Sequence, residues 1–159
     1  MPSTTPERGP VGTALVSAAA VAAALAAIHL VNLLFGGLPW SFLYGGSPAD
    51  SLVGFFWDLF GYVLPFAIGV FLSLFLIAPV RPGMGVVSVG VRGLIASAVG
   101  GVLVFVAGIL VRLVQSGLHD ILQQTIGSIF GIVANAVVNA PLVILVLVVQ
   151  HRIVRGARL

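Results

Sequence analysis

Few side chains of this chain could do chemistry, and most of them lie inside long apolar stretches. Four of them fall at similar depth in the outer half when the chain is threaded through a membrane as four spans: His29, Asn32, Asp58 and Arg112. An acid inside a span costs about 2.5–3.5 kcal/mol at mid-membrane, so Asp58 is expected to face other helices and to pair with Arg112. This polar intramembrane cluster predicts one of two things. It is a site that handles a proton or an ion from outside, or a buried ion pair with a hydrogen-bonded histidine that only fixes packing.

A second polar set lies on the last apolar stretch. Its members recur every fourth residue and so share one helix face: Gly127, Gly131, Asn135 and Asn139. The glycines would let another backbone approach closely. The carboxamides would either line a pathway or join helices by hydrogen bonds worth about 0.6–2 kcal/mol each. In both cases this face is predicted to meet a protein partner.

Other chemistries are excluded by what the chain lacks. With no Cys, there is no disulfide, thiolate metal site or thiol catalysis. No nucleophile has a base at a suitable spacing, no His or carboxylate pair has metal-ligand spacing, and no glycine-rich loop fits a phosphate. A membrane aspartyl hydrolase would need two acids at one depth, and the candidates are Asp58 and the turn residue Asp120. The sequence therefore predicts no catalytic residue, no metal and no cofactor.

The composition is that of a membrane protein. Hydrophobic residues make up 60% and charged residues 7%, whereas about 25% of residues are charged in soluble domains. The mean hydropathy is +1.23. The net charge of +3 comes from arginines scattered at the ends of apolar stretches, which form no basic face and argue against a nucleic-acid partner. The predicted partner is the lipid bilayer.

The apolar stretches predict an all-α, polytopic integral membrane protein built as a bundle of four transmembrane helices. Residues 1–10 are expected to be a disordered tail, 11–155 a single transmembrane domain and 156–159 a basic tail. The helices are predicted to cover approximately 11–35, 48–79, 86–115 and 120–152.

Local signals refine the first two helices. The stretch from Gly36 to Asp50 is rich in Gly, Pro and aromatic residues, which favours a turn lying along the membrane interface. Ser47 followed by Pro48 is typical of a helix start, and Pro65 is the expected bend of the second helix. Around that helix the phenylalanines are expected mostly to face lipid, while a stripe of small and polar residues faces protein: Gly54, Asp58, Gly61, Pro65, Gly69 and Ser73.

The third helix carries two rows of small residues. Gly93, Ser97 and Gly101 form one row, and Ala96 and Gly100 form a parallel one. Small residues at this spacing allow close approach of neighbouring helices. Both rows are therefore predicted to be packing faces.

The arginines predict the orientation. Threading four spans places most of them on one side of the membrane and Asp50 and Asp120 on the other. By the positive-inside rule, both termini are expected to be cytoplasmic. Abundant Ala, Gly, Val and Arg without Lys suggests a GC-rich bacterial genome, which would place the protein in a bacterial cytoplasmic membrane.

Three functions are compatible with these features. The favoured one is a small non-enzymatic membrane subunit or scaffold, which assembles with itself or with a larger complex through the small-residue faces of the third and fourth helices. The alternative is a small oligomeric permease or channel whose pathway uses Asp58, Arg112, His29 and the two Asn. A membrane enzyme ranks third.

Overall fold

The computed structural model describes residues 10–81, 83–116 and 121–156, and all the elements that it contains there are helical. They are the α-helices α1 (Pro10–Asn32), α2 (Leu38–Leu43), α3 (Pro48–Asp58), α4 (Leu64–Leu72), α5 (Val86–Ser116) and α6 (Ile121–Gly156), and the π-helical turns η1 (Leu33–Gly37), η2 (Leu59–Val63) and η3 (Ser73–Ile77). The predicted all-α class is confirmed.

Within the described residues, four helical segments are long and apolar enough to cross a membrane. They are Val11–Leu43, Pro48–Ile77, Val86–Val111 and Phe130–Ile153. The first of these segments has 33 residues and, at 1.5 Å per residue, is roughly 50 Å long. This length exceeds the roughly 30 Å thickness of the hydrocarbon layer of a membrane. The chain therefore has the features of a multi-pass membrane protein.

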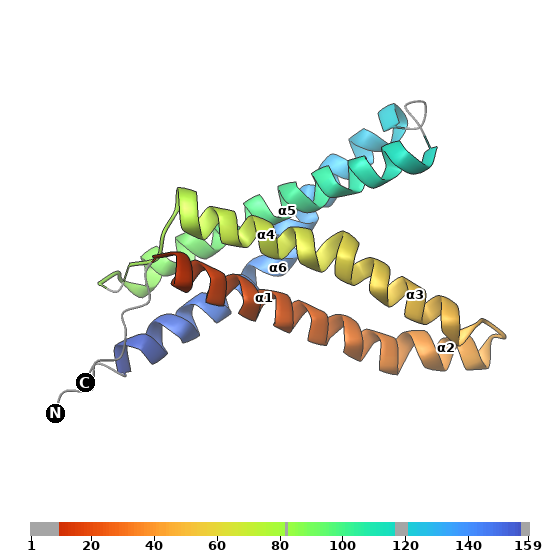
Figure 1. Ribbon diagram of the computed structural model, residues 1–159, viewed down its shortest axis with the longest axis horizontal. Helices are drawn as coiled ribbons and strands as arrows, with labels where there is room; N and C mark the ends of the chain where they lie inside the picture. Colours follow the sequence, from red (N-terminus) through yellow and green to blue (C-terminus); the bar gives the residue numbers. More distant parts are fainter. Residues whose placement is uncertain (1–9, 82, 117–120, 157–159) are drawn as a thin grey trace.

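The helices form two hairpins that cross each other (Figure 1). The first hairpin comprises residues 10–77, and the second consists of α5 and α6. At one end, here called the closed end, residues 78–85 connect the hairpins, and the start of α1 and the end of α6 lie nearby (Figure 1). At the other, the open end, the hairpins diverge, and neither α2 nor α3 contacts α5 or α6 within the described part.

The first helix is longer than the sequence predicts. Instead of ending near residue 35, it continues through η1 and α2 to Leu43, and the turn expected over Gly36–Asp50 is confined to residues 44–47. Pro39 does not break this helix because a π-turn precedes it, closed by a hydrogen bond from Leu38 N–H to Leu33 O. The wider turn relieves the clash between a proline ring and the carbonyl four residues earlier.

A π-turn also allows the second helix to continue past Pro65. The π-turn η2 directly precedes this proline, and Leu64 N–H donates to Leu59 O. The helix therefore passes the predicted bend without interruption and reaches Ile77. At its start the predicted cap is present, since the Ser47 hydroxyl accepts a hydrogen bond of 3.2 Å from Ala49 N–H.

The core lies in the closed half, where all four long helices meet. Its fully buried side chains come from each of them: Val21, Phe66, Val70, Val89 and Val143. Phe66 corrects the expectation that the phenylalanine rings of the second helix mostly face lipid, because its ring packs over Gly100 of α5. Other rings of this helix, such as Phe56 and Phe60, are exposed as expected.

Both small-residue rows of α5 are packing faces. A Cβ added at Gly93 would lie 2.8 Å from Ile144 Cγ1, and one at Gly101 would lie 3.2 Å from Ile132 O, so this row meets α6. Between them, the Ser97 hydroxyl donates to Ala136 O at 2.7 Å. The parallel row meets α4, where a Cβ at Gly69 would lie only 2.6 Å from Gly100 Cα. The helices pack backbone to backbone here.

Only half of the stripe of small and polar residues on the second helix is buried against other helices. Gly69 and Ser73 are buried against the core, in agreement with the prediction. In contrast, a Cβ at Gly54 or Gly61 would meet nothing within 4 Å, and the Asp58 side chain is 56% exposed. Among the described residues, the part of the stripe toward the open end therefore has no packing partner of the kind that the sequence predicts.

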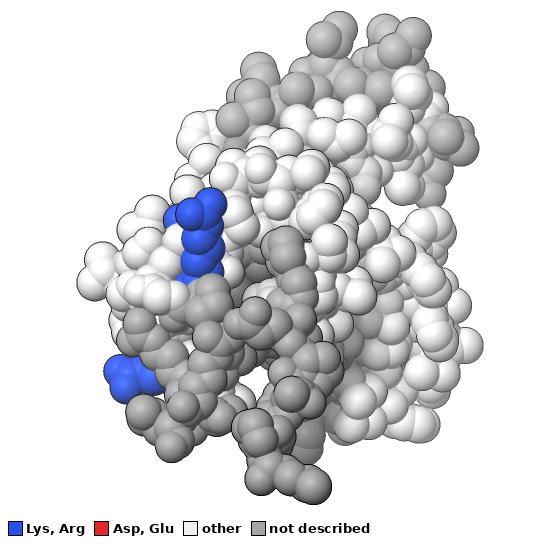
Figure 2. Space-filling view, turned by 60° about the vertical axis from the view of Figure 1, so that its left-hand side comes forward, with Lys and Arg blue, Asp and Glu red and all other residues white. Residues whose placement is uncertain are grey.

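Polar contacts hold the closed end together. The Ser17 hydroxyl lies 2.5 Å from Gln150 Oε1, which joins α1 to α6, and His151 Nε2 lies 2.9 Å from Met84 O. Arg92 donates to Pro79 O across the same connection. Figure 2 is turned toward this end and shows described arginine side chains but no described acidic one on the visible face.

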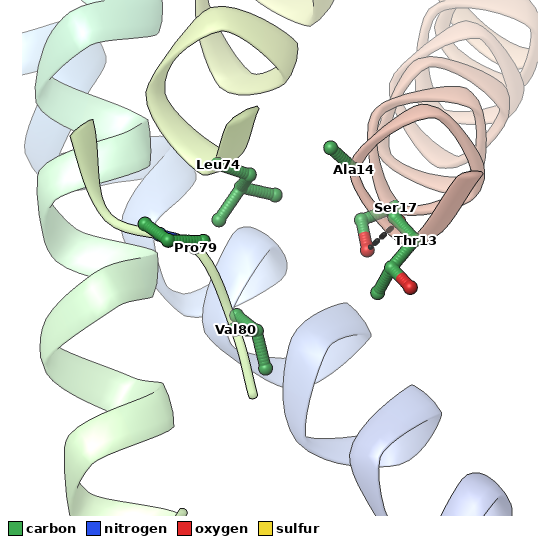
Figure 3. A pocket seen from close by; sticks show the side chains of 6 residues that line it. All are labelled: Thr13, Ala14, Ser17, Leu74, Pro79 and Val80. Carbon is green, nitrogen blue, oxygen red and sulfur yellow. Dashed lines mark hydrogen bonds between the residues drawn. The ribbon is translucent and has the colours of Figure 1, made fainter. Parts of the chain in front are cut away.

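A small pocket lies beside these contacts (Figure 3). It is lined by Thr13, Ala14, Ser17, Leu74, Pro79 and Val80. Its interior has room for about one water molecule. The pocket is therefore a packing gap between α1 and the connection, too small for an organic ligand.

Gly69→Ala tests the backbone contact between α4 and α5. The added methyl group would overlap the Gly100 backbone, and overpacking of this kind destabilises by about 1–3 kcal/mol. Unfolding in detergent micelles, followed by circular dichroism, measures the loss. Gly90→Ala is the matched control: a Cβ there meets nothing, so we expect no loss of stability. Equal effects of the two substitutions would contradict the packing.

Candidate functional site

A histidine and an aspartate from different helices meet within the apolar region. His29 Nδ1 of α1 lies 3.2 Å from Asp58 Oδ2 at the end of α3. The side chains are 23% and 56% exposed, respectively. Two of the four residues of the predicted polar cluster are thus brought together, and they can share a proton between an imidazole and a carboxylate.

Tyr62 extends this pair toward the second hairpin. Its ring centroid lies 5.6 Å from that of His29, and the rings are tilted by 58°. Its hydroxyl accepts a hydrogen bond from Asn139 Nδ2, which belongs to α6 and is buried. Two polar contacts, between Asp58 and His29 and between Tyr62 and Asn139, are therefore joined by the ring contact of His29 with Tyr62.

Sequence reasoning missed Tyr62, although a signal was available. Tyr62 follows Asp58 by four residues and therefore lies on the same helix face one turn later. A buried tyrosine hydroxyl usually finds a hydrogen-bond partner, so a tyrosine beside an intramembrane acid was a candidate for the cluster.

The contact between Tyr62 and Asn139 lies at the middle of both helices. Tyr62 is central in the segment Pro48–Ile77, and Asn139 is central in α6. From this point the hairpins pack together toward the closed end and diverge toward the open end (Figure 1). The contact between His29 and Asp58 lies just on the open side of it.

The other members of the predicted cluster are placed differently. Asn32 is exposed at the end of α1, one turn beyond His29. The side chain of Arg112 lies outside the described residues, so its pairing with Asp58 stays a prediction. The backbones of α3 and α5, which carry the two residues, do not contact each other within the described part. In that part, Asp58 pairs with His29.

The predicted face of α6 is described in part. Gly131 is half-buried, and a Cβ added there meets nothing within 4 Å among the described residues, so no described helix packs on it closely. Asn139 is buried against Tyr62 and joins the hairpins. The surroundings of Gly127 and the side chain of Asn135 lie outside the described residues.

The described residues bring together no group of three or more His, Cys, Asp or Glu that would suit a metal ion. The site has one carboxylate, one imidazole, one phenol and one carboxamide. Chemically, this set can bind a proton or a cationic group at Asp58, while a separate hydrogen bond between Tyr62 and Asn139 joins the first hairpin to α6.

Comparisons with models of known protein families, with curated proteins and with solved structures find no match for this chain. Its function is therefore inferred from its own residues.

A double-mutant cycle tests which side chain is the partner of Asp58. The loss of stability in the double mutant His29→Ala, Asp58→Ala should be smaller than the sum of the single losses by about 0.2–1 kcal/mol, the range for exposed ion pairs. Thermal unfolding in detergent provides the measurement. Additive losses would show that the two side chains are not coupled. The same cycle with Arg112→Ala in place of His29→Ala tests whether Arg112 also interacts with Asp58.

Proposed function

We propose that this chain is a small, non-enzymatic subunit or scaffold of a bacterial cytoplasmic membrane, which assembles with further copies or with a larger complex. The observation that supports this proposal is the divergence of the hairpins beyond Tyr62 and Asn139. In the closed half, small residues are used for close packing within the chain. In the open half, Gly54, Gly61 and Gly131 have nothing within 4 Å of an added Cβ.

Bare helix backbone of this kind favours association with another helix. Between helices in lipid, the driving forces are close packing and hydrogen bonds, and glycines permit both. The small-residue rows of α5 are already occupied by α4 and α6, so the surface proposed for assembly is that of Gly131 on α6. This narrows the surface predicted from the sequence, which included the third helix.

The proposed orientation has both termini in the cytoplasm. Arg81, Arg92 and Arg152 lie at the closed end, whereas Asp50 lies at the open end, in the first turn of α3. The positive-inside rule places the arginine-rich end on the cytoplasmic side. The open end and its diverging hairpins would then face the outside.

Single cysteines test this orientation directly because the chain has no native Cys. In intact cells, a membrane-impermeant maleimide should label Pro48→Cys, at the start of α3 at the open end, and should not label Gly85→Cys, in the connection at the closed end. Both variants should be labelled after the membrane is permeabilised. The reverse pattern in intact cells would overturn the orientation.

Gly131→Leu tests the assembly surface. A leucine side chain inserted where another backbone packs should weaken association by about 1–3 kcal/mol, with little effect on the fold of the single chain. Native mass spectrometry from detergent measures the fraction of oligomer or complex. Gly90→Leu makes the same change at an open glycine near the closed end and should be silent. Equal association of both variants and wild type would remove the case for this surface.

A second candidate function, a small oligomeric permease or channel, is favoured by one specific observation. The pair His29 and Asp58 and the pair Tyr62 and Asn139 lie next to each other at mid-helix, where a translocation pathway would need polar groups. Purification from the native membrane separates the two candidates. A stoichiometric unrelated partner favours the subunit, and a homo-oligomer with a hydrated axis favours transport.

A further inference from the structure

The carboxylate of Asp58 is exposed, and the described residues cover only part of it. Its side chain is 56% exposed although it lies well inside an apolar helical segment. His29 touches one carboxylate oxygen, at 3.2 Å. A carboxylate facing lipid is costly unless a positive charge or a proton covers it. A cationic partner on the remaining surface of Asp58 would meet this requirement.

There is room for that partner beside Asp58. Gly54 and Gly61 lie on the adjacent turns of the same helix face, and a Cβ added at either would meet nothing within 4 Å. The carboxylate is thus flanked by bare backbone on both sides. A group larger than a proton can approach it without displacing any side chain at these two positions.

Aromatic rings border this surface. Phe55 and Tyr62 lie on the neighbouring turns of the helix that carries Asp58, and Tyr62 also contacts His29. Aromatic faces attract cations within about 6 Å of the ring centroid, most strongly where water is excluded. The surroundings of Asp58 therefore favour a cation that also has an apolar surface.

The charges of the described chain point the same way. The arginine side chains that the structure describes lie in the connection (Arg81), in the second turn of α5 (Arg92) and near the end of α6 (Arg152), all at the closed end, whereas Asp58 lies near the middle of its helical segment. A strongly hydrated inorganic ion would need several oxygen ligands to replace its water, and the described residues place no second Asp or Glu, and no group of three His, Cys, Asp or Glu, around such an ion. An organic cation spreads its charge and buries its apolar groups against the rings.

We propose that Asp58, with His29 and the surface between Gly54 and Gly61, is a binding site for a hydrophobic organic cation. The cation lies against the free face of the carboxylate, and the glycines provide the space. Binding at this site requires neither of the functions proposed above. The site lies on the second helix, whereas the proposed assembly surface is on α6.

The test uses tetraphenylphosphonium as the probe and the purified full chain in lipid nanodiscs. Equilibrium dialysis of the radiolabelled cation should show saturable binding, and Asp58→Asn should weaken it by at least about tenfold. Asp50→Asn, which removes the acid in the first turn of the same helix, should bind like wild type. Tetraphenylborate has the same shape and the opposite charge, and it should not compete.

A second variant tests the surface beside Asp58 without changing the carboxylate itself. Gly61→Leu fills open surface, so it should leave the melting temperature unchanged and weaken binding severalfold, whereas Gly90→Leu should change neither. Non-saturable binding, equal competition by tetraphenylborate, or wild-type binding by Asp58→Asn or Gly61→Leu would overturn the site. Since assembly is measured separately with Gly131→Leu, failure of one proposal does not imply failure of the other.

Discussion

Close contact between helix backbones is the interaction on which the rest of this structure depends. Apolar side chains gain nothing by leaving lipid for one another, so helices in a bilayer are held by tight packing and hydrogen bonds. In this chain the tight contacts are Gly69 on Gly100, Gly93 on Ile144 and Gly101 on Ile132. They fix α4, α5 and α6 as one unit, and α1 joins it through the core around Val21. The first two lie between the closed end and the middle of the helices, and the third joins α5 to α6 within the second hairpin.

In the open half, the described residues of the two hairpins make no such backbone contacts, and the hairpins diverge there. Toward the open end, a Cβ added at Gly108 of α5 or Gly131 of α6 would meet nothing, and the same holds for Gly54 in α3. Small residues thus occur along the whole length of the helices, but those of one hairpin meet the other in one half only. The hydrogen bond between Asn139 and Tyr62 lies at the boundary between the halves. The polar site is therefore located where internal packing stops.

The sequence allowed the packing rows of α5 and the cap at Ser47 to be predicted, because both depend on local spacing along one helix. It did not allow the continuation of the first helix through Pro39 to be predicted, since a π-turn accommodates a proline that would otherwise end a helix. It placed His29 in the same cluster as Asp58 but named Arg112 as the ion-pair partner, whereas the described partner of Asp58 is His29. The sequence indicates which residues lie at the same depth in the membrane. It does not show which helices are neighbours, because that depends on packing between residues far apart in the sequence.

The uncovered surfaces of the open half are not equivalent. Lipid chains can cover the exposed apolar side chains and the bare backbone at Gly131, because those backbone groups are already hydrogen-bonded within the helix. Lipid chains cannot cover Asp58 without leaving a carboxylate poorly solvated, and His29 reaches one of its oxygens. An assembly partner at Gly131 is thus optional for the stability of the single chain. At Asp58, in contrast, water, a proton or a cation has to complete the site, so the chemistry of this protein is expected to centre on that residue.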